Sequence, residues 1–206
     1  MKKKLTYKNI LGTACLLTGL VMSSAVSANL VNVDFSNGLN GWGGDVVYYD
    51  TENDMDNNVT DVIFGDYSNN FSTTSNSVTL NTFADTTNEY WGVYLYQEFM
   101  VAAGTSEISL KIDSTADYAY VTLVDENLDL VHDFKNGGLS VDISTFIGSL
   151  MSLEFGIEDS NYAYDDYLTV SNITISKQSI SVTEPASWAL FLLALAGIIK
   201  RFIKIA

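Results

Sequence analysis

The chain has 206 residues, of which 25 are acidic and ten are Lys or Arg, so its net charge is −15 at neutral pH. All the acidic residues lie at or after Asp34, and the region from Asn29 to Thr183 holds 24 of them against three lysines. Such a charge repels nucleic acid and anionic lipid, which excludes both as partners of this region. The single cysteine, Cys15, precedes the region, so disulfide and thiol chemistry are excluded there too.

The N-terminus has the three-part pattern of a secretory signal peptide. Its positive part carries Lys2, Lys3, Lys4 and Lys8. An apolar core at 10–22 and the small-residue cleavage site Val26-Ser27-Ala28 follow. We therefore predict that residues 1–28 form a signal-peptide helix, which the general secretion machinery uses and signal peptidase removes. An uncleaved membrane anchor is the alternative.

Residues 29–180 alternate between apolar and polar side chains with a period of two, as half-buried β-strands do. In the segment 91–99 one face carries Trp91, Val93, Leu95 and Phe99, and the other carries Tyr94, Tyr96 and Glu98. The same pattern predicts strands at 108–112, 118–124, 128–134, 150–157 and 168–175. Because turn residues separate these segments and no helical pattern of ten residues occurs among them, we predict one antiparallel β-sandwich domain.

Two turns are predicted within this domain. The acidic and amide side chains of Asp125, Glu126 and Asn127 favour a hairpin turn between two of the strands. The segment 144–148 is predicted to form a short crossover turn, in which Phe146 closes the open end of the core.

Four short segments, in order, resemble the motifs of galactose-binding-like jelly rolls and of the carbohydrate-binding modules built on them. They are 32–42 (NVDFSNGLNGW), 96–104 (YQEFMVAAG), 141–148 (VDISTFIG) and 170–175 (VSNITI). They are similar to the family patterns DFE-x-GL-x-GW, QTFTVPAG, VDLSAFAG and LDNVSL. The resemblance covers nearly the whole domain and implies an antiparallel jelly-roll β-sandwich.

Members of that fold often hold a structural Ca²⁺ between an acidic residue after the first Phe and an Asp of the last strand. Ser36 and Ser171 occupy these positions here, with Asp34 and Asn172 beside them. Two of the hard oxygen ligands that calcium favours are therefore absent together.

A second calcium candidate is the acidic segment 50–61. Its carboxylates have the spacing of an EF-hand loop: Asp50, Glu52, Asp54, Asp56 and Asp61. Met55 stands where that loop needs a glycine, and no helix is predicted on either side. A polar loop between two strands is the alternative interpretation.

Carbohydrate binding requires aromatic rings that lie together, because the C–H face of a sugar stacks on a ring while nearby polar groups bind its hydroxyls. The candidate ligand-binding residues are Trp42, Tyr94, Tyr96, Tyr118 and Tyr120. The alternative is that the tyrosines stabilise the sheet as cross-strand pairs and that Trp42 belongs to the core.

Few residues are suited to catalysis. His132 is the only histidine, so neither a Ser-His-Asp triad nor a zinc site is favoured. Two carboxylate pairs, Glu158-Asp159 and Asp165-Asp166, have the residue types used in glycoside hydrolysis, but such pairs are also common in surface turns. We predict no catalytic residues.

The C-terminus, 181–206, has the order of a membrane sorting signal. Glu184-Pro185 precedes an apolar run at 186–199, which is about 21 Å long as a helix and so barely spans a bilayer. The basic end consists of Lys200, Arg201 and Lys204. These charges resist translocation, which places the domain on the far side of the membrane.

This tail resembles the PEP-CTERM signal of Gram-negative bacteria, with Thr183 in place of the first proline. The resemblance implies a transmembrane sorting helix that an exosortase removes during release of the protein toward the cell surface. An ordinary anchor that is never cut is the alternative.

The sequence thus predicts a protein exported across the inner membrane and released, after passing through a membrane-anchored precursor, to the cell surface or extracellular matrix. We expect a non-catalytic role there, with exopolysaccharide as a partner. The alternatives are a glycan-binding module and a glycoside-active enzyme. No cofactor is expected other than Ca²⁺.

Overall fold

The computed structural model describes residues 29–50, 52–83, 89–159 and 166–178. These ranges contain eleven β-strands and one short 3-10 helix, η1 (Ser144–Phe146). None of their helices is long and apolar enough to cross a membrane. The predicted signal-peptide helix and sorting helix lie outside the described residues. For the part of the chain that the structure describes, the prediction of an all-β fold is confirmed.

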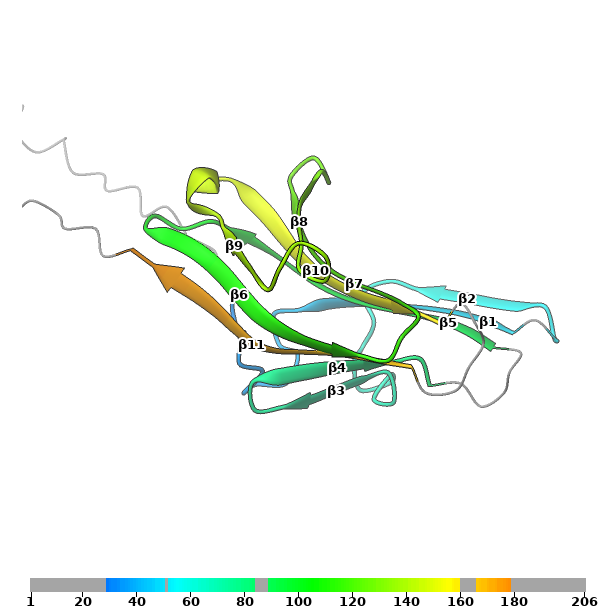
Figure 1. The fold of residues 1–206 in the computed structure, drawn as a ribbon. Coiled ribbons are helices and arrows are strands. Elements are labelled where there is room, and N and C mark those ends of the chain that lie inside the picture. The colour runs from blue at the N-terminus through cyan, green and yellow to red at the C-terminus, as the bar shows by residue number, and fades with distance from the viewer. Residues whose placement is uncertain (1–28, 51, 84–88, 160–165, 179–206) are drawn as a thin grey trace, which may run out of the picture.

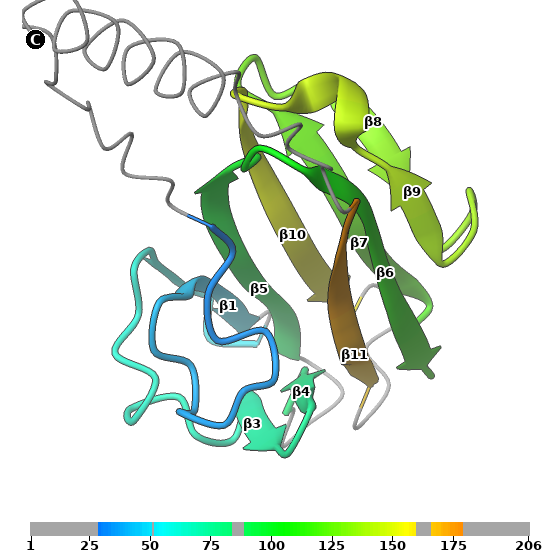
Figure 2. The ribbon, with the colours of Figure 1, turned by 90° about the vertical axis from the view of Figure 1, so that its left-hand side faces the viewer.

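The strands form two antiparallel sheets, which Figures 1 and 2 show as two layers. In spatial order, the six-stranded sheet consists of β2 (Met55–Val59), β1 (Gly43–Asp50), β5 (Glu89–Met100), β10 (Leu150–Glu158), β7 (Tyr118–Asp125) and β8 (Leu130–Asp133). The five-stranded sheet consists of β3 (Phe71–Thr74), β4 (Ser77–Asn81), β11 (Tyr167–Lys177), β6 (Thr105–Ser114) and β9 (Ser140–Asp142).

The core lies between the two sheets and is built from alternate residues of their central strands. The six-stranded sheet contributes fully buried side chains that include Val93, Leu95, Val121, Leu153 and Phe155. The five-stranded sheet contributes Val78, Leu80, Ile108, Leu168 and Val170. Removing this apolar surface from water is the main favourable contribution to folding, and it fixes which face of each strand points outward.

Six of the strands coincide with predicted segments, namely β5, β6, β7, β8, β10 and β11. The other five, β1 to β4 and β9, have no counterpart in the prediction. In β2 only Met55 and Val59 are apolar, and every residue except Val59 is exposed. Its extended conformation comes from pairing with β1, which in turn pairs along its whole length with β5. Local patterning carries no signal for such a strand.

Both predicted turns are present. Residues 125–129 join β7 to β8, and the carboxylate of Asp125 accepts hydrogen bonds from the backbone N–H groups of Asn127 and Asp129, at 2.9 and 3.0 Å. The crossover segment contains η1, where Phe146 is half-buried against the core. Ile143 beside it is the fully buried residue, so it closes this end of the core more completely than the predicted Phe146.

The N-terminal segment, 29–42, packs its aromatic rings into the core. The Trp42 ring lies between those of Phe35 and Phe155, with centroid separations of 5.4 and 5.3 Å. Only 6% of Trp42 is exposed. Neighbouring rings thus cover most of Trp42, in agreement with the alternative that it belongs to the core, and ligand binding by Trp42 stays a prediction.

One buried polar side chain, Gln97 of β5, attaches this segment to the six-stranded sheet. Its Oε1 accepts a hydrogen bond from the Val31 N–H at 2.6 Å, and its Nε2 donates to the Gly41 carbonyl at 2.7 Å. Gln97 points inward, between the apolar residues Leu95 and Phe99. A buried polar group is stable only when it is hydrogen-bonded, and Gln97 meets this requirement with backbone partners.

Replacing Gln97 with Met keeps the length of the side chain but leaves the Val31 N–H and the Gly41 carbonyl without these partners. We expect Gln97→Met to lower the free energy of unfolding by about 1–3 kcal/mol. Urea unfolding followed by tryptophan fluorescence measures this loss. The matched control is Glu98→Gln, one residue further along on the exposed side, where we expect a change of less than about 0.5 kcal/mol. Equal stability of both variants would contradict the role given to Gln97.

Candidate functional site

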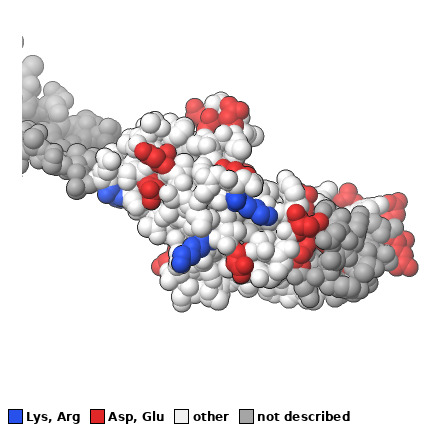
Figure 3. Space-filling view, viewed as in Figure 1, with Lys and Arg blue, Asp and Glu red and all other residues white. Residues whose placement is uncertain are grey.

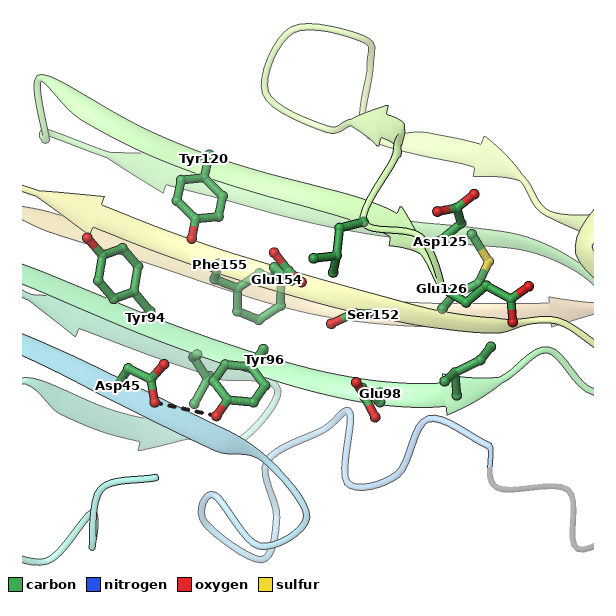
Figure 4. Close-up of a pocket in the computed structure, with 14 residues that line it drawn as sticks. Asp45, Tyr94, Tyr96, Glu98, Tyr120, Asp125, Glu126, Ser152, Glu154 and Phe155 are labelled. Atoms are coloured by element: carbon green, nitrogen blue, oxygen red, sulfur yellow. Dashed lines mark hydrogen bonds between the residues drawn. The ribbon is translucent and has the colours of Figure 1, made fainter. Parts of the chain in front are cut away.

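Tyrosines from two strands lie on the outer face of the six-stranded sheet. Tyr94 of β5 is aligned with Gly156 of β10, and Gly156 is aligned with Tyr120 of β7. Tyr96 and Tyr118 follow at positions of the same parity, so the four predicted tyrosines share one face. Figure 4 shows the rings of Tyr94, Tyr96 and Tyr120 above the sheet. Their joint position agrees with the alternation read in the sequence, and ligand binding by them stays a prediction.

Three glycines leave the space in which these rings lie. A Cβ atom on Gly43 would come within 2.6 Å of the Tyr96 ring, and one on Gly92 within 2.6 Å of the Tyr94 hydroxyl. The Tyr120 ring covers Gly156 even more closely. Tyr96 and Tyr120 therefore lean across the sheet onto backbone that carries no side chain, whereas Tyr94 leans along its own strand over Gly92. Aromatic rings that cover glycines in this way stabilise a sheet.

The rings also contact one another. The centroids of Tyr94 and Tyr120 are 6.4 Å apart, with an interplanar angle of 30°. Tyr118 meets Tyr120 edge-on, at the same centroid separation and an angle of 65°. Tyr94, Tyr96 and Tyr120 are partly buried, whereas Tyr118 is exposed, with 50% of its surface accessible to solvent. We call the first three residues the tyrosine platform, and Tyr118 lies at its margin.

The platform forms part of a hollow of about 480 Å³ on this face (Figure 4). Apart from Ser152, the non-aromatic side chains that line it are carboxylates or apolar. Its carboxylates come from Asp45, Glu98, Asp125, Glu126 and Glu154. Its apolar residues include Leu128, Leu150 and Met151. The volume is in the range of ligand sites, and aromatic walls with a few polar groups are typical of such sites.

Carboxylates orient two of the platform hydroxyls. Tyr94 donates its O–H to Glu158 at 2.9 Å, and Tyr96 donates to Asp61 at 3.0 Å. Burial, followed by the hydrogen bond to Asp61 and the negative charge of Asp45, raises the pKa of Tyr96 to about 12. Burial also raises the pKa of Tyr94 and of Tyr120. The platform therefore stays uncharged at neutral pH.

The predicted EF-hand-like residues belong to the hairpin of β1 and β2 and to the segment that follows it. Asp50 accepts hydrogen bonds from the backbone N–H groups of Glu52 and Asn53, at 2.9 and 3.1 Å, and Asp54 accepts one from the Tyr49 hydroxyl. Asp56 belongs to β2 and is paired with Tyr49 of β1.

Asp61, the last of these predicted ligands, is used at the tyrosine platform, where it accepts the Tyr96 hydroxyl. Among the described residues, no group of three His, Cys, Asp or Glu side chains is placed to hold a metal ion. Calcium binding by this segment stays a prediction.

The two positions where the jelly-roll family places calcium ligands lie in connected segments. The Asn76 N–H donates to the Asp34 carbonyl at 2.8 Å, and the Asn172 N–H donates to the Asn76 carbonyl at 2.9 Å. The Asp34 carboxylate accepts the Ser36 backbone N–H and hydroxyl, and these bonds lower its pKa. Ser36, which stands where the family has a calcium ligand, thus hydrogen-bonds the neighbouring Asp34 carboxylate.

The residues considered for catalysis have structural partners. The Nε2 atom of His132 is 2.8 Å from the Gly138 carbonyl, and its ring packs edge-on against Phe134. Asp159 is fully buried and Asp166 is 7% exposed, and burial, together with nearby Asp117 and Asp159, raises the pKa of Asp166. Asp165 lies outside the described residues. Asp159 and Asp166 are therefore buried, unlike the carboxylates of an exposed surface turn.

Similarity to known proteins is found among solved structures. No protein-family model matches the sequence, and no curated protein matches it. The chain is similar to the carbohydrate-binding module TmCBM61, solved in complex with β-1,4-galactotriose, with a TM-score of 0.43 and 12% sequence identity. The similarity covers 73% of this chain and 99% of that module.

The glycine beneath Tyr120 can be tested without a ligand. Adding a Cβ atom in Gly156→Ala forces the Tyr120 ring away from the sheet and into water, which lowers its pKa because burial is the main cause of its raised value. We expect one more tyrosine of the variant to ionise near the ordinary value, about pH 10, in an alkaline absorbance titration.

Gly65→Ala is the matched control, because a Cβ atom there meets nothing within 4 Å. We expect its titration curve to coincide with that of the unmodified chain. If Gly156→Ala also gives an unchanged curve, the Tyr120 ring does not depend on the glycine.

Proposed function

We propose that the chain is a non-catalytic glycan-binding protein and that the tyrosine platform is its binding surface. The observation that carries this proposal is the set of three rings resting over glycines, with their free sides toward one hollow. A pyranose ring presents a flat C–H face that stacks on such a surface, while its hydroxyls are hydrogen-bonded by nearby carboxylates. The sandwich would then belong to the jelly-roll type that the sequence motifs resemble.

Other features support a glycan over an apolar ligand. The hollow has carboxylates on its margins, and Glu98 and Glu154 on the same outer face form no hydrogen bond or ion pair with any described residue. Hydroxyl groups of a sugar are suited to these acceptors, whereas an apolar ligand would bury them without a partner. Glu158 orients the platform instead, because its carboxylate accepts the Tyr94 hydroxyl.

The double variant Tyr96→Ala and Tyr120→Ala removes two of the stacking surfaces. We expect it to lose at least about fivefold in affinity in pull-downs on a panel of insoluble polysaccharides that includes β-1,4-galactan, since each stacking contact contributes about 0.5–1.5 kcal/mol. Tyr167→Ala on β11, in the other sheet, is the control and should bind as the unmodified chain does. Absence of binding to every polysaccharide in the panel would exclude this function.

We further propose that the protein reaches the cell surface or an exopolysaccharide matrix. The support for this proposal comes from the sequence of the two ends, namely the signal-peptide pattern of 1–28 and the tail that resembles a PEP-CTERM signal. The partners implied are the secretion machinery, signal peptidase and an exosortase. A glycan-binding domain delivered in this way would attach the protein to surface polysaccharide.

Intact-mass measurement of the native protein tests this sorting. We expect the released form to lack residues 1–28 and the residues after about Glu184, and a strain without the exosortase to retain an uncut membrane form. A tail that persists in both strains would show that the segment is an ordinary membrane anchor.

A further inference from the structure

The charge around the tyrosine platform is of one sign. Five of the residues that line the hollow are carboxylates, and none of the described residues that line it is Lys or Arg. Asp61 and Glu158 extend this negative margin at the hydroxyls of Tyr96 and Tyr94. An anionic sugar such as a uronic acid would therefore meet carboxylates on several sides and no described cation.

The described cations lie elsewhere. Lys111 belongs to β6 and Lys177 ends β11, both in the five-stranded sheet. Figure 3 shows basic side chains over and beside these strands, on the face that Figure 1 turns toward the viewer. Lys135 donates its Nζ to the Ala119 carbonyl at 3.2 Å, and it does not line the hollow. None of these lysines neutralises the carboxylates of the platform.

Two carboxylates on the strands that carry or adjoin the rings are available to a ligand. Glu154 is aligned with Tyr96 on one side and Thr122 on the other, and it lies one row from Tyr94, Gly156 and Tyr120. Figure 4 shows it between the rings of Tyr96 and Tyr120, with Glu98 further along β5. Both side chains are without a hydrogen bond or ion pair to the described residues. Asp45, Asp61, Asp125 and Glu158 already accept hydrogen bonds, and Glu126 lies in the turn after β7.

Aromatic faces and free carboxylates together recognise one kind of group. An ammonium ion is attracted to the face of a tyrosine ring and forms charge-assisted hydrogen bonds with a carboxylate. The negative potential at the platform is also felt by Tyr120, whose pKa is raised by burial and then by Glu154 and Glu158. A neutral sugar stacks on the rings and donates ordinary hydroxyl hydrogen bonds to the carboxylates, whereas a sugar with a free amine adds a charge-assisted bond and a cation–π contact.

We propose that the platform binds a polysaccharide whose sugars carry free primary ammonium groups, with the sugar rings on Tyr94, Tyr96 and Tyr120 and the ammonium groups at Glu98 and Glu154. This inference rests on the proposed glycan-binding function and names its substrate class.

Three oligosaccharides of equal length test the proposal by calorimetry with the full chain in a mild detergent. They are β-1,4-linked glucosamine, its fully N-acetylated form and an oligouronate, at a mildly acidic pH where amines are protonated and most Asp and Glu side chains are ionised. We expect the glucosamine oligomer to bind at least about tenfold more tightly than the N-acetylated one, with a preference that added salt reduces. The oligouronate should not bind.

Variants assign the preference to the site. In the double variant Glu98→Gln and Glu154→Gln, we expect the glucosamine oligomer to bind only as tightly as the N-acetylated oligomer does. Binding of the N-acetylated oligomer should be the same in the variant and in the unmodified chain. Glu107→Gln on β6 removes one charge from the other sheet and should leave the preference intact.

Each contrary outcome has a separate meaning. Equal binding of all three oligomers, lost in the double tyrosine variant, would overturn the ammonium preference and leave glycan binding standing. Glucosamine binding that survives the tyrosine variant, or that falls equally in Glu107→Gln, would show attraction by overall charge and would also overturn it. If no oligomer or polysaccharide binds, both proposals fail.

Discussion

The register of β5 is the constraint on which the rest of the structure depends. This strand lies between β1 and β10, and its twelve residues divide into two sets that face opposite sides of the sheet. Val93, Leu95 and Phe99 belong to the core, and Tyr94 and Tyr96 belong to the outer face. Because the side-chain period of a strand is two, a shift of one residue would exchange these sets. Burial of the core residues therefore also fixes the orientation of the tyrosines.

Glycines allow the tyrosine rings to lie down on the sheet. On a pleated strand a tyrosine ordinarily stands among the side chains of its neighbours. Here Gly43, Gly92 and Gly156 offer backbone where those side chains would be, and the rings lean across it. Since the supporting atoms belong to paired strands, a ligand would meet rings that are already oriented, which lowers the entropy cost of binding.

The sequence alone predicts the strands whose two faces differ strongly, and it predicts that the tyrosines of β5 and β7 share a face. It does not predict β2 or β3, because segments such as Met-Asp-Asn-Asn-Val become strands only through their partners. The positions of Gly43 beneath Tyr96 and of Gly156 beneath Tyr120 depend on cross-strand register, which no local pattern contains. The burial of Trp42 is not evident from local sequence either, because the rings of Phe35 and Phe155 that cover it lie across a turn and at a distant position in the chain.

The exposed strand β2 has a consequence for how copies of the protein behave together. As the outermost strand of its sheet, it offers unpaired backbone groups along one side, which in many β proteins invites strand pairing with a second molecule. Its middle residues, Asp56, Asn57 and Asn58, are exposed and one is charged. Polar and charged side chains along such an edge oppose continuous sheet formation between molecules. Pairing of the β2 edge with a second copy of the chain is therefore disfavoured.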